Sequence, residues 1–283
     1  MAFPPFPSGV IPVPLDALRP LALIYIFGMT GVLAFLWYRG KITRTIAVAV
    51  LLVSALFGFL FASVAPYLFQ LLLLGNLGAF LVFTIVILGL LFLLTLVFGR
   101  IFCGSLCPLG ALQELASLAP LPKIRYREKK VLYAVRFVVL FIIIAAALLL
   151  SVNVLGYLGV LDLFLLTFSL GTAVMLTILI ISLFFYRPFC RILCPYGALL
   201  ALGGMGSPFK LRRNPSCIEC GKCEFACPVD EAKREDLKGE CYLCGRCTEV
   251  CPVPGTISYR RGGDASGRPP GEPEATGTAE RAE

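Results

Sequence analysis

The stretch that decides the fold is FCGSLCPLGALQEL, residues 102–115, which places Cys103 and Cys107 four positions apart directly after a long apolar run. A second copy, FCRILCPYGALLAL, occupies residues 189–202. Both cysteines, the proline that follows them and a Gly-Ala-Leu triplet recur at a constant shift of 87 positions (102 to 189). A register kept over so many positions indicates an internal duplication rather than an accident of composition.

The composition is that of a membrane protein. Of the 283 residues, 58% are hydrophobic and only 15% are charged, with a mean hydropathy of +0.88, which is too apolar for an ordinary soluble domain. The net charge of +8 does not indicate nucleic acid, because the basic residues form short clusters beside apolar segments, where charge sets membrane orientation. We therefore expect the lipid bilayer, and no nucleic acid, as a partner.

Apolar runs of about twenty residues, the length that crosses the hydrocarbon core, predict five transmembrane helices near 20–38, 45–65, 78–98, 132–151 and 165–186. With the amino terminus outside, every Lys and Arg except Arg19 falls on the inner side. Arg136, one turn into the fourth span, is expected to snorkel to that surface. The fold class is then an all-α membrane protein of the inner (cytoplasmic) membrane, multi-pass, with the C-x3-C-P stretches at the cytoplasmic surface and everything after residue 187 in the cytoplasm.

The duplication gives the domain layout. The third span with the first cysteine stretch, and the fifth span with the second, both run from outside to inside, so they are parallel repeats about an axis along the membrane normal. We expect that axis to bring the two cysteine pairs together. The predicted units are an outer segment (1–19), two helices with an outer loop (20–77), the duplicated unit (78–202), a linker (203–213), a small α+β cysteine-rich domain (214–260) and a disordered tail (261–283).

Residues 217–252 contain CIECGKCEFACP and CYLCGRCTEVCP, which is C-x2-C-x2-C-x3-C-P twice. In this spacing three cysteines of one run hold one [4Fe–4S] cluster and the fourth reaches the neighbouring cluster. Structural zinc is the weaker alternative, because zinc ligands usually come as separate C-x2-C hooks. The chain has no histidine, so we expect no haem. The predicted ligands are Cys217, Cys220, Cys223 and Cys251 for the first cluster, and Cys241, Cys244, Cys247 and Cys227 for the second.

The other four cysteines belong to the membrane repeat. Pro108 is well placed to begin a helix, so Cys107 lies near a helix N-terminus, where exposed N–H groups favour anions. Four thiols from two symmetric loops could hold a third [4Fe–4S] cluster, a zinc ion or a redox-active dithiol pair, and the sequence leaves these alternatives open. The residues are Cys103, Cys107, Cys190 and Cys194.

Residues 78–260 as a whole resemble the membrane-bound, polyferredoxin-type iron–sulfur proteins of the NapH, NosR and CcoG group, and residues 214–260 resemble a bacterial-type two-cluster ferredoxin. The resemblance rests on the repeated C-x3-C-P unit followed by the doubled ferredoxin run. It implies electron transfer between membrane quinone and a partner redox chain, as in nitrate or nitrous-oxide respiration, or reduction of copper during oxidase assembly. By position it extends to all twelve cysteines.

We therefore predict an electron carrier that relays single electrons between quinone or quinol, or a membrane partner, and a redox partner protein of a respiratory or reductase complex. An oxidoreductase subunit of the quinol dehydrogenase type is the enzymatic version, although no catalytic residue stands out. The alternative is a redox-sensing or assembly factor, including one that reduces a metal for a respiratory enzyme. Weak candidates for quinone contacts are Gln113 and Glu114 beside the first cysteine pair, Tyr67 and Gln70 in an outer loop, and Asp162, which we favour as an interfacial loop residue.

Overall fold

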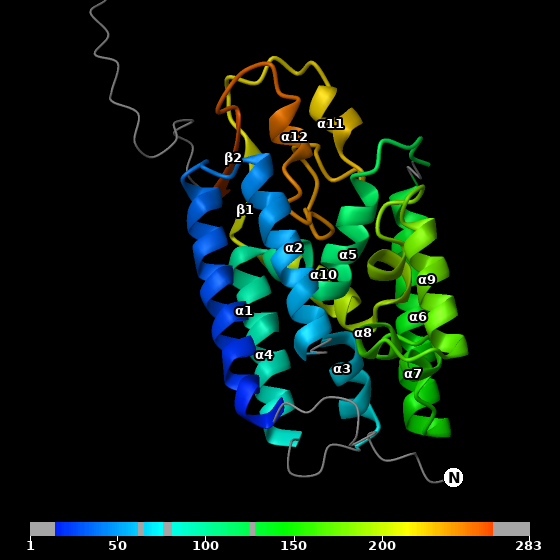
Figure 1. Cartoon of the computed structure of the whole chain (residues 1–283). Coiled ribbons are helices and arrows are strands. Elements are labelled where there is room, and N and C mark those ends of the chain that lie inside the picture. The colour runs from blue at the N-terminus through cyan, green and yellow to red at the C-terminus, as the bar shows by residue number, and fades with distance from the viewer. Residues whose placement is uncertain (1–14, 62–64, 76–80, 125–127, 263–283) are drawn as a thin grey trace, which may run out of the picture.

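The computed structural model describes residues 15–61, 65–75, 81–124 and 128–262. Its longer helices stand side by side as a bundle, with a small cysteine-rich unit at one end (Figure 1). These helices are α1 (Leu15–Tyr38), α2 (Arg44–Phe61), α4 (Leu81–Phe98), α6 (Lys129–Leu150) and α9 (Leu170–Ile181). The short helices α3 (Ala65–Leu73) and α7 (Val154–Tyr157) meet at the opposite end, where Gln70 donates to the Val152 carbonyl and accepts from the Leu155 N–H.

The bundle helices are apolar outside as well as inside. Among the described residues two helices, 81–98 and 129–150, are long and apolar enough to cross a membrane, with hydropathies of 3.0 and 2.7. Shorter apolar helices at 24–38, 44–58 and 170–181 match the other three predicted spans. Large apolar side chains face outward, for example Phe141 at 73% exposed and Leu149 at 82%. Such a surface suits lipid, so the protein is associated with a membrane, while the count of five spans stays a prediction.

The fifth predicted span, 165–186, is not one helix. The chain forms α8 (Asp162–Leu165), turns at Leu166 with a φ of 54°, and starts α9 only after Ser169. The Ser169 hydroxyl accepts from the Thr172 N–H and donates to the Asp162 carboxylate, so polar side chains cap the break. Asp162, the first residue of α8, is thus bonded to its own neighbours.

The duplication is visible in the backbone. After α4 the chain makes the π turn η2 (Phe102–Leu106) and helix α5 (Pro108–Ser117), and after α9 it makes η3 (Phe189–Leu193) and α10 (Pro195–Gly206). Each turn closes with a cysteine N–H donating to the carbonyl of the phenylalanine five residues earlier, at 2.8 Å in the first copy and 2.9 Å in the second. Each cysteine is then extended, with a proline that opens the next helix. π turns inside helical proteins are frequent at functional sites.

Both cysteine stretches pack against the bundle helices. The Tyr196 hydroxyl at the start of α10 donates to the Leu88 carbonyl in the middle of α4, whereas the Ser207 hydroxyl just beyond α10 donates to the Val97 carbonyl near the end of α4. A Cβ on Gly58 in α2 would lie 2.4 Å from that of Pro108. Both turns therefore pack inside the bundle before α5 and α10 begin, while the position of these stretches relative to the membrane surface stays a prediction. Irregular backbone inside a helix bundle needs partners for its N–H and C=O groups, and here protein groups provide them.

The cysteine-rich unit contains a small two-stranded sheet and two short helices. Strands β1 (Phe209–Arg213) and β2 (Ile257–Arg261) pair antiparallel, with Leu211 opposite Tyr259. Helices α11 (Lys222–Ala226) and α12 (Arg246–Glu249) lie between the two strands in the sequence. The predicted linker, 203–213, thus contains the end of α10 and all of β1. The Tyr259 hydroxyl donates to the Phe98 carbonyl at the end of α4, which ties the sheet to the bundle. The predicted tail and most of the predicted outer segment lie outside the described residues.

Candidate functional site

The twelve cysteines are all free thiols and line three cavities, four to each. The two cavities of the cysteine-rich unit group the thiols as the sequence predicted, with Cys227 and Cys251 exchanged between the two runs. The pseudo-symmetric turns η2 and η3 bring the remaining four together. We call these cavities site 1 (Cys217, Cys220, Cys223, Cys251), site 2 (Cys227, Cys241, Cys244, Cys247) and the membrane site (Cys103, Cys107, Cys190, Cys194).

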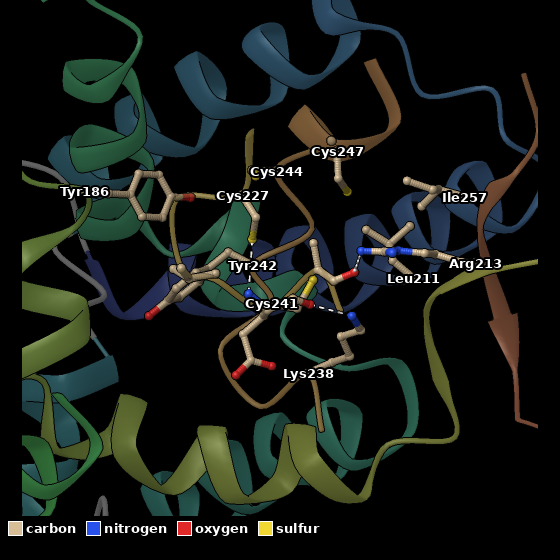
Figure 2. Close-up of a pocket in the computed structure, with 14 residues that line it drawn as sticks. Tyr186, Leu211, Arg213, Cys227, Lys238, Cys241, Tyr242, Cys244, Cys247 and Ile257 are labelled. Atoms are coloured by element: carbon tan, nitrogen blue, oxygen red, sulfur yellow. Dashed lines mark hydrogen bonds between the residues drawn. The ribbon is translucent and has the colours of Figure 1, made fainter. Parts of the chain in front are cut away.

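Local backbone geometry places the thiols of sites 1 and 2. Gly221 and Gly245, each following the second cysteine of its run, have φ values of 72° and 80° and begin α11 and α12. A left-handed residue there is easiest for glycine. Cys220 is exposed at site 1, whereas site 2 lies between the sheet and the bundle, with its cysteines around a common space (Figure 2).

Burial disfavours the thiolate form of two cysteines of site 2. Burial raises the pKa of Cys241 to about 12 and that of Cys244 to about 11, so both would stay protonated at neutral pH without a metal. Metal coordination removes such protons outright. The Cys227 sulfur accepts the Glu231 N–H at 3.3 Å, and hydrogen bonds to sulfur are one of the ways a protein tunes an iron–sulfur cluster.

The membrane site is buried. Its four cysteines are between 6% and 8% exposed, and its wall also includes Arg100, Tyr196 and Gly197. The Gly197 N–H donates to the Cys194 sulfur at 3.1 Å, and the Gln113 amide nitrogen lies 3.4 Å from the Cys190 sulfur. The Gln113 side chain also accepts the Phe189 N–H at 3.1 Å. Gln113, a weak candidate for quinone contact in the sequence, thus joins the two repeats instead.

Four buried arginines surround the membrane site. The Arg136 guanidinium pairs with Glu240 and donates to the Cys190 carbonyl at 3.0 Å, so the prediction that Arg136 snorkels to the surface is wrong. Arg187 donates to the carbonyls of Cys103 and Gly104, each at 2.6 Å. The other two are Arg100 and Arg191, 1% and 3% exposed.

Two buried carboxylates face these four guanidinium groups. Glu240 pairs with three of them, and Glu114 accepts from Arg187 at 2.9 Å. Burial alone would raise the pKa of Glu114, but Arg187 and Arg246 hold the pKa of this carboxyl below its ordinary value. Glu114 is therefore an ion-pair partner. The surplus of positive charge suits four thiolates, because a buried anion is costly unless cations compensate it.

Sequence reasoning missed the arginines, although a signal existed. Arg100 and Arg187 stand at equivalent positions of the duplication, each three residues before the first cysteine of its stretch. Both close the start of a π turn: the Gly104 N–H donates to the Arg100 carbonyl and the Arg191 N–H to that of Arg187. A cation that repeats beside a repeated thiol pair could have been assigned to the site.

The donor set fits a multinuclear iron–sulfur group. Each cavity offers four thiols, which is the ligand set of a [4Fe–4S] cluster. A tetrahedral zinc ion needs its sulfurs about 2.3 Å from one point. Within the described ranges no three Cys, Asp or Glu side chains form a group that could hold a single metal ion. The thiols instead stand around cavities.

A fourth cavity, of about 230 Å³, lies between α2, α5 and α12. Ala47, Val48 and Leu51 of α2 form one apolar wall. Gly104, Leu118 and Leu243 also line it, together with polar side chains and a cysteine of site 2: Arg44, Ser105, Glu114, Ser117, Cys244, Arg246 and Glu249. We call it the α2–α5 cavity. Nothing in the sequence indicated it, because its walls come from segments far apart in the chain.

Comparison with known proteins points to the same chemistry. The family model described as a 4Fe-4S binding domain matches residues 80–127 and 152–214, which include both C-x3-C-P stretches. No solved structure matches the chain.

Three relatives show how far the similarity extends. An uncharacterised protein of Methanocaldococcus jannaschii is 37% identical over 52% of this chain and 67% of its own length. YccM of Escherichia coli, named provisionally for electron transport, is 37% identical over 48% of this chain and 43% of its own. The regulatory protein NosR of Pseudomonas aeruginosa is 29% identical over 47% of this chain and 21% of its own. The chain thus spans two thirds of the first relative and less than half of the other two.

Proposed function

The chain belongs to the ferredoxin-type 4Fe-4S membrane proteins of the NapH and NosR group, and on that premise we propose that it relays single electrons between the membrane and a redox partner protein. Sites 1 and 2 and the membrane site would each hold one [4Fe–4S] cluster. Such clusters, when bound, supply one-electron redox chemistry at potentials set by charge, hydrogen bonds to sulfur and solvent exposure. The chain itself supplies ligands, spacing and electrostatics.

The observation that carries the proposal is that neighbouring cavities are joined by shared or directly contacting residues. Arg213 and Ile257 line both site 1 and site 2. Tyr242 lines site 2 and stacks on Arg100, which lines the membrane site. Site 1, with its exposed Cys220, is the end at which a soluble redox partner would dock.

The membrane site as a third centre is supported by two independent features. The 4Fe-4S family model matches the duplicated unit rather than the doubled ferredoxin run. The surplus of buried guanidinium groups also needs an anionic occupant, and a cluster ligated by four thiolates is anionic. Four protonated thiols that only pack against one another would leave that positive charge uncompensated.

The experiment is a count of iron and acid-labile sulfide per chain after anaerobic purification. We expect about twelve irons in the native chain, and about eight when the four membrane-site cysteines are all replaced with Ser. The signals of sites 1 and 2 in electron paramagnetic resonance (EPR) should be unchanged in the variant, which controls for misfolding. Eight irons in both proteins would overturn the third centre, and far fewer with zinc present would overturn the relay.

For the membrane end of the relay we propose that a quinone head group enters the α2–α5 cavity, whose wall includes Gly104 and Ser105, the two residues that follow Cys103 of the membrane site. The apolar residues of α2 suit a lipid-soluble ring, and Ser105 and Ser117 are hydroxyl groups able to bond its oxygens. Cys244 of site 2 lines the same cavity. The distance from quinone to a redox centre would then be short.

Filling that cavity tests the assignment. Ala47→Phe should abolish reduction of the chain by a short-chain quinol, because the ring would occupy the α2–α5 cavity. Ala49→Phe is the matched control, since Ala49 is exposed on the same helix and lies outside the cavity lining. Equal reduction of the two variants would contradict the site. A native chain with full iron that no quinol reduces would favour the redox-sensing or assembly role, in line with the regulatory name of NosR.

A further inference from the structure

Tyr242 lies between site 2 and the membrane site, because it lines the first and contacts Arg100 in the wall of the second. It lies between Cys241 and Cys244 in the sequence and forms part of the wall of site 2 (Figure 2). The side chain is 2% exposed, yet its hydroxyl has no hydrogen-bond partner within the described residues. A buried tyrosine whose hydroxyl bonds to nothing is held there by its ring.

The two repeat-equivalent arginines both stack on that ring. The Arg100 Cζ lies 4.3 Å from the ring centroid and the Arg187 Cζ 4.7 Å from it. Both guanidinium groups are almost fully buried, where cation–π contact is strongest. The pseudo-symmetric halves of the membrane repeat therefore converge on one residue of the cysteine-rich unit.

Each arginine also reaches the membrane site. Arg100 lines its cavity and donates to the Gly197 carbonyl at 3.2 Å. Arg187 binds the carbonyls of Cys103 and Gly104. Gly104 itself meets Tyr242, because a Cβ at this glycine would lie 2.0 Å from the Tyr242 carbonyl oxygen. The backbone of η2 is thus in close contact with the backbone of Tyr242, while the ring of Tyr242 is held by the two arginines.

We propose that Tyr242 is the positioning residue that couples site 2 to the membrane site, its ring fixing Arg100 and Arg187 and thereby the spacing of the two centres. The inference rests on the proposed relay and adds its order, with site 2 rather than site 1 facing the membrane site. In each transfer the electron lost by one centre is the electron gained by the other. Tyr242 is neither oxidised nor deprotonated.

The test compares three variants of the full chain. Tyr242→Leu removes the ring and both stacking contacts. Tyr242→Phe keeps the ring and removes only an unpartnered hydroxyl. Tyr259→Leu controls for general loosening of the unit, because it removes a ring that is also 2% exposed and a bond to the Phe98 carbonyl but leaves both arginine contacts of Tyr242 in place.

After photoreduction from a soluble donor, freeze-quench EPR follows the appearance of the reduced membrane centre. We expect it to appear at least an order of magnitude more slowly in Tyr242→Leu, and at native rates in Tyr242→Phe and Tyr259→Leu. Amide hydrogen exchange of residues 239–245 should accelerate only in Tyr242→Leu, a readout that does not depend on electron flow.

Iron counts distinguish failure of the Tyr242 proposal from failure of the proposed relay. Twelve irons in every variant with equal transfer rates and equal exchange would overturn the role of Tyr242 and leave the relay standing. A slowing in Tyr259→Leu equal to that in Tyr242→Leu would reduce the effect to general destabilisation and overturn the proposal as well. Eight irons in the native chain would overturn the third centre itself, and the coupling with it.

Discussion

Replacing Glu240 with Gln is expected to destabilise the folded protein by about 3–5 kcal/mol, the usual cost of breaking a buried ion pair from one side. Glu240 is 4% exposed and pairs with Arg136, with Arg191 at 3.3 Å and with Arg100 at 3.9 Å. Without its charge, three buried guanidinium groups lose their common counter-ion. Because these groups face the membrane site, we expect the variant to lose iron there first.

The measurement is the folded fraction of detergent-purified protein against temperature, with iron determined on the same samples. Glu249→Gln is the control, since Glu249 is an exposed acid of the same unit and should change neither quantity. Native thermal stability and native iron content in Glu240→Gln would show that the arginines do not need this partner. The balance of charge proposed around the membrane site would then be wrong.

The sequence predicted the features that depend on spacing. The duplication, the small α+β unit and the grouping of cysteines into three sets of four follow from register, and the structure places the thiols in those sets. Spacing is informative because a cluster fixes how many residues can separate its ligands.

Packing and burial were not predictable in the same way. A hydropathy run ends at Phe98, and nothing in a one-dimensional pattern says that the next residues turn back into the bundle. Arg136, one turn into an apolar segment, has the sequence signature of a snorkelling residue. Its partner Glu240 lies 104 residues away, so only the tertiary fold reveals the buried pair.

The break in the fifth predicted span was also not predictable from hydropathy. Residues 163–181 are almost wholly apolar and favour one continuous helix on hydropathy alone. Asp162, Thr167 and Ser169 supply side-chain bonds that compete with the helix, and the chain turns at Leu166. A close contact follows, because a Cβ on Gly159 would lie 2.0 Å from the Gly171 carbonyl carbon. Gly159 and Gly171, one on each side of the break, were the available sequence signal for this close approach.

The second large effect concerns the crossed ligand sets of sites 1 and 2. Each single replacement, Cys220→Ala, Cys227→Ala or Cys251→Ala, is expected to remove one cluster, or about four irons. Single variants cannot reveal which thiols share a cluster. Double variants can, because two losses at one site do not add, whereas losses at separate sites do.

In the structure Cys220 and Cys251 line one cavity and Cys227 lines the other, although Cys227 belongs to the run of Cys220 in the sequence. We therefore expect Cys220→Ala with Cys251→Ala to lose about four irons, and Cys220→Ala with Cys227→Ala to lose about eight. The reverse pattern would mean that each run folds around its own cluster. That result would also remove the basis for the relay order, because the crossing through Cys227 is what ties the exposed run to the buried site beside Tyr242. Iron and sulfide analysis of the two double variants, purified side by side, decides between these arrangements.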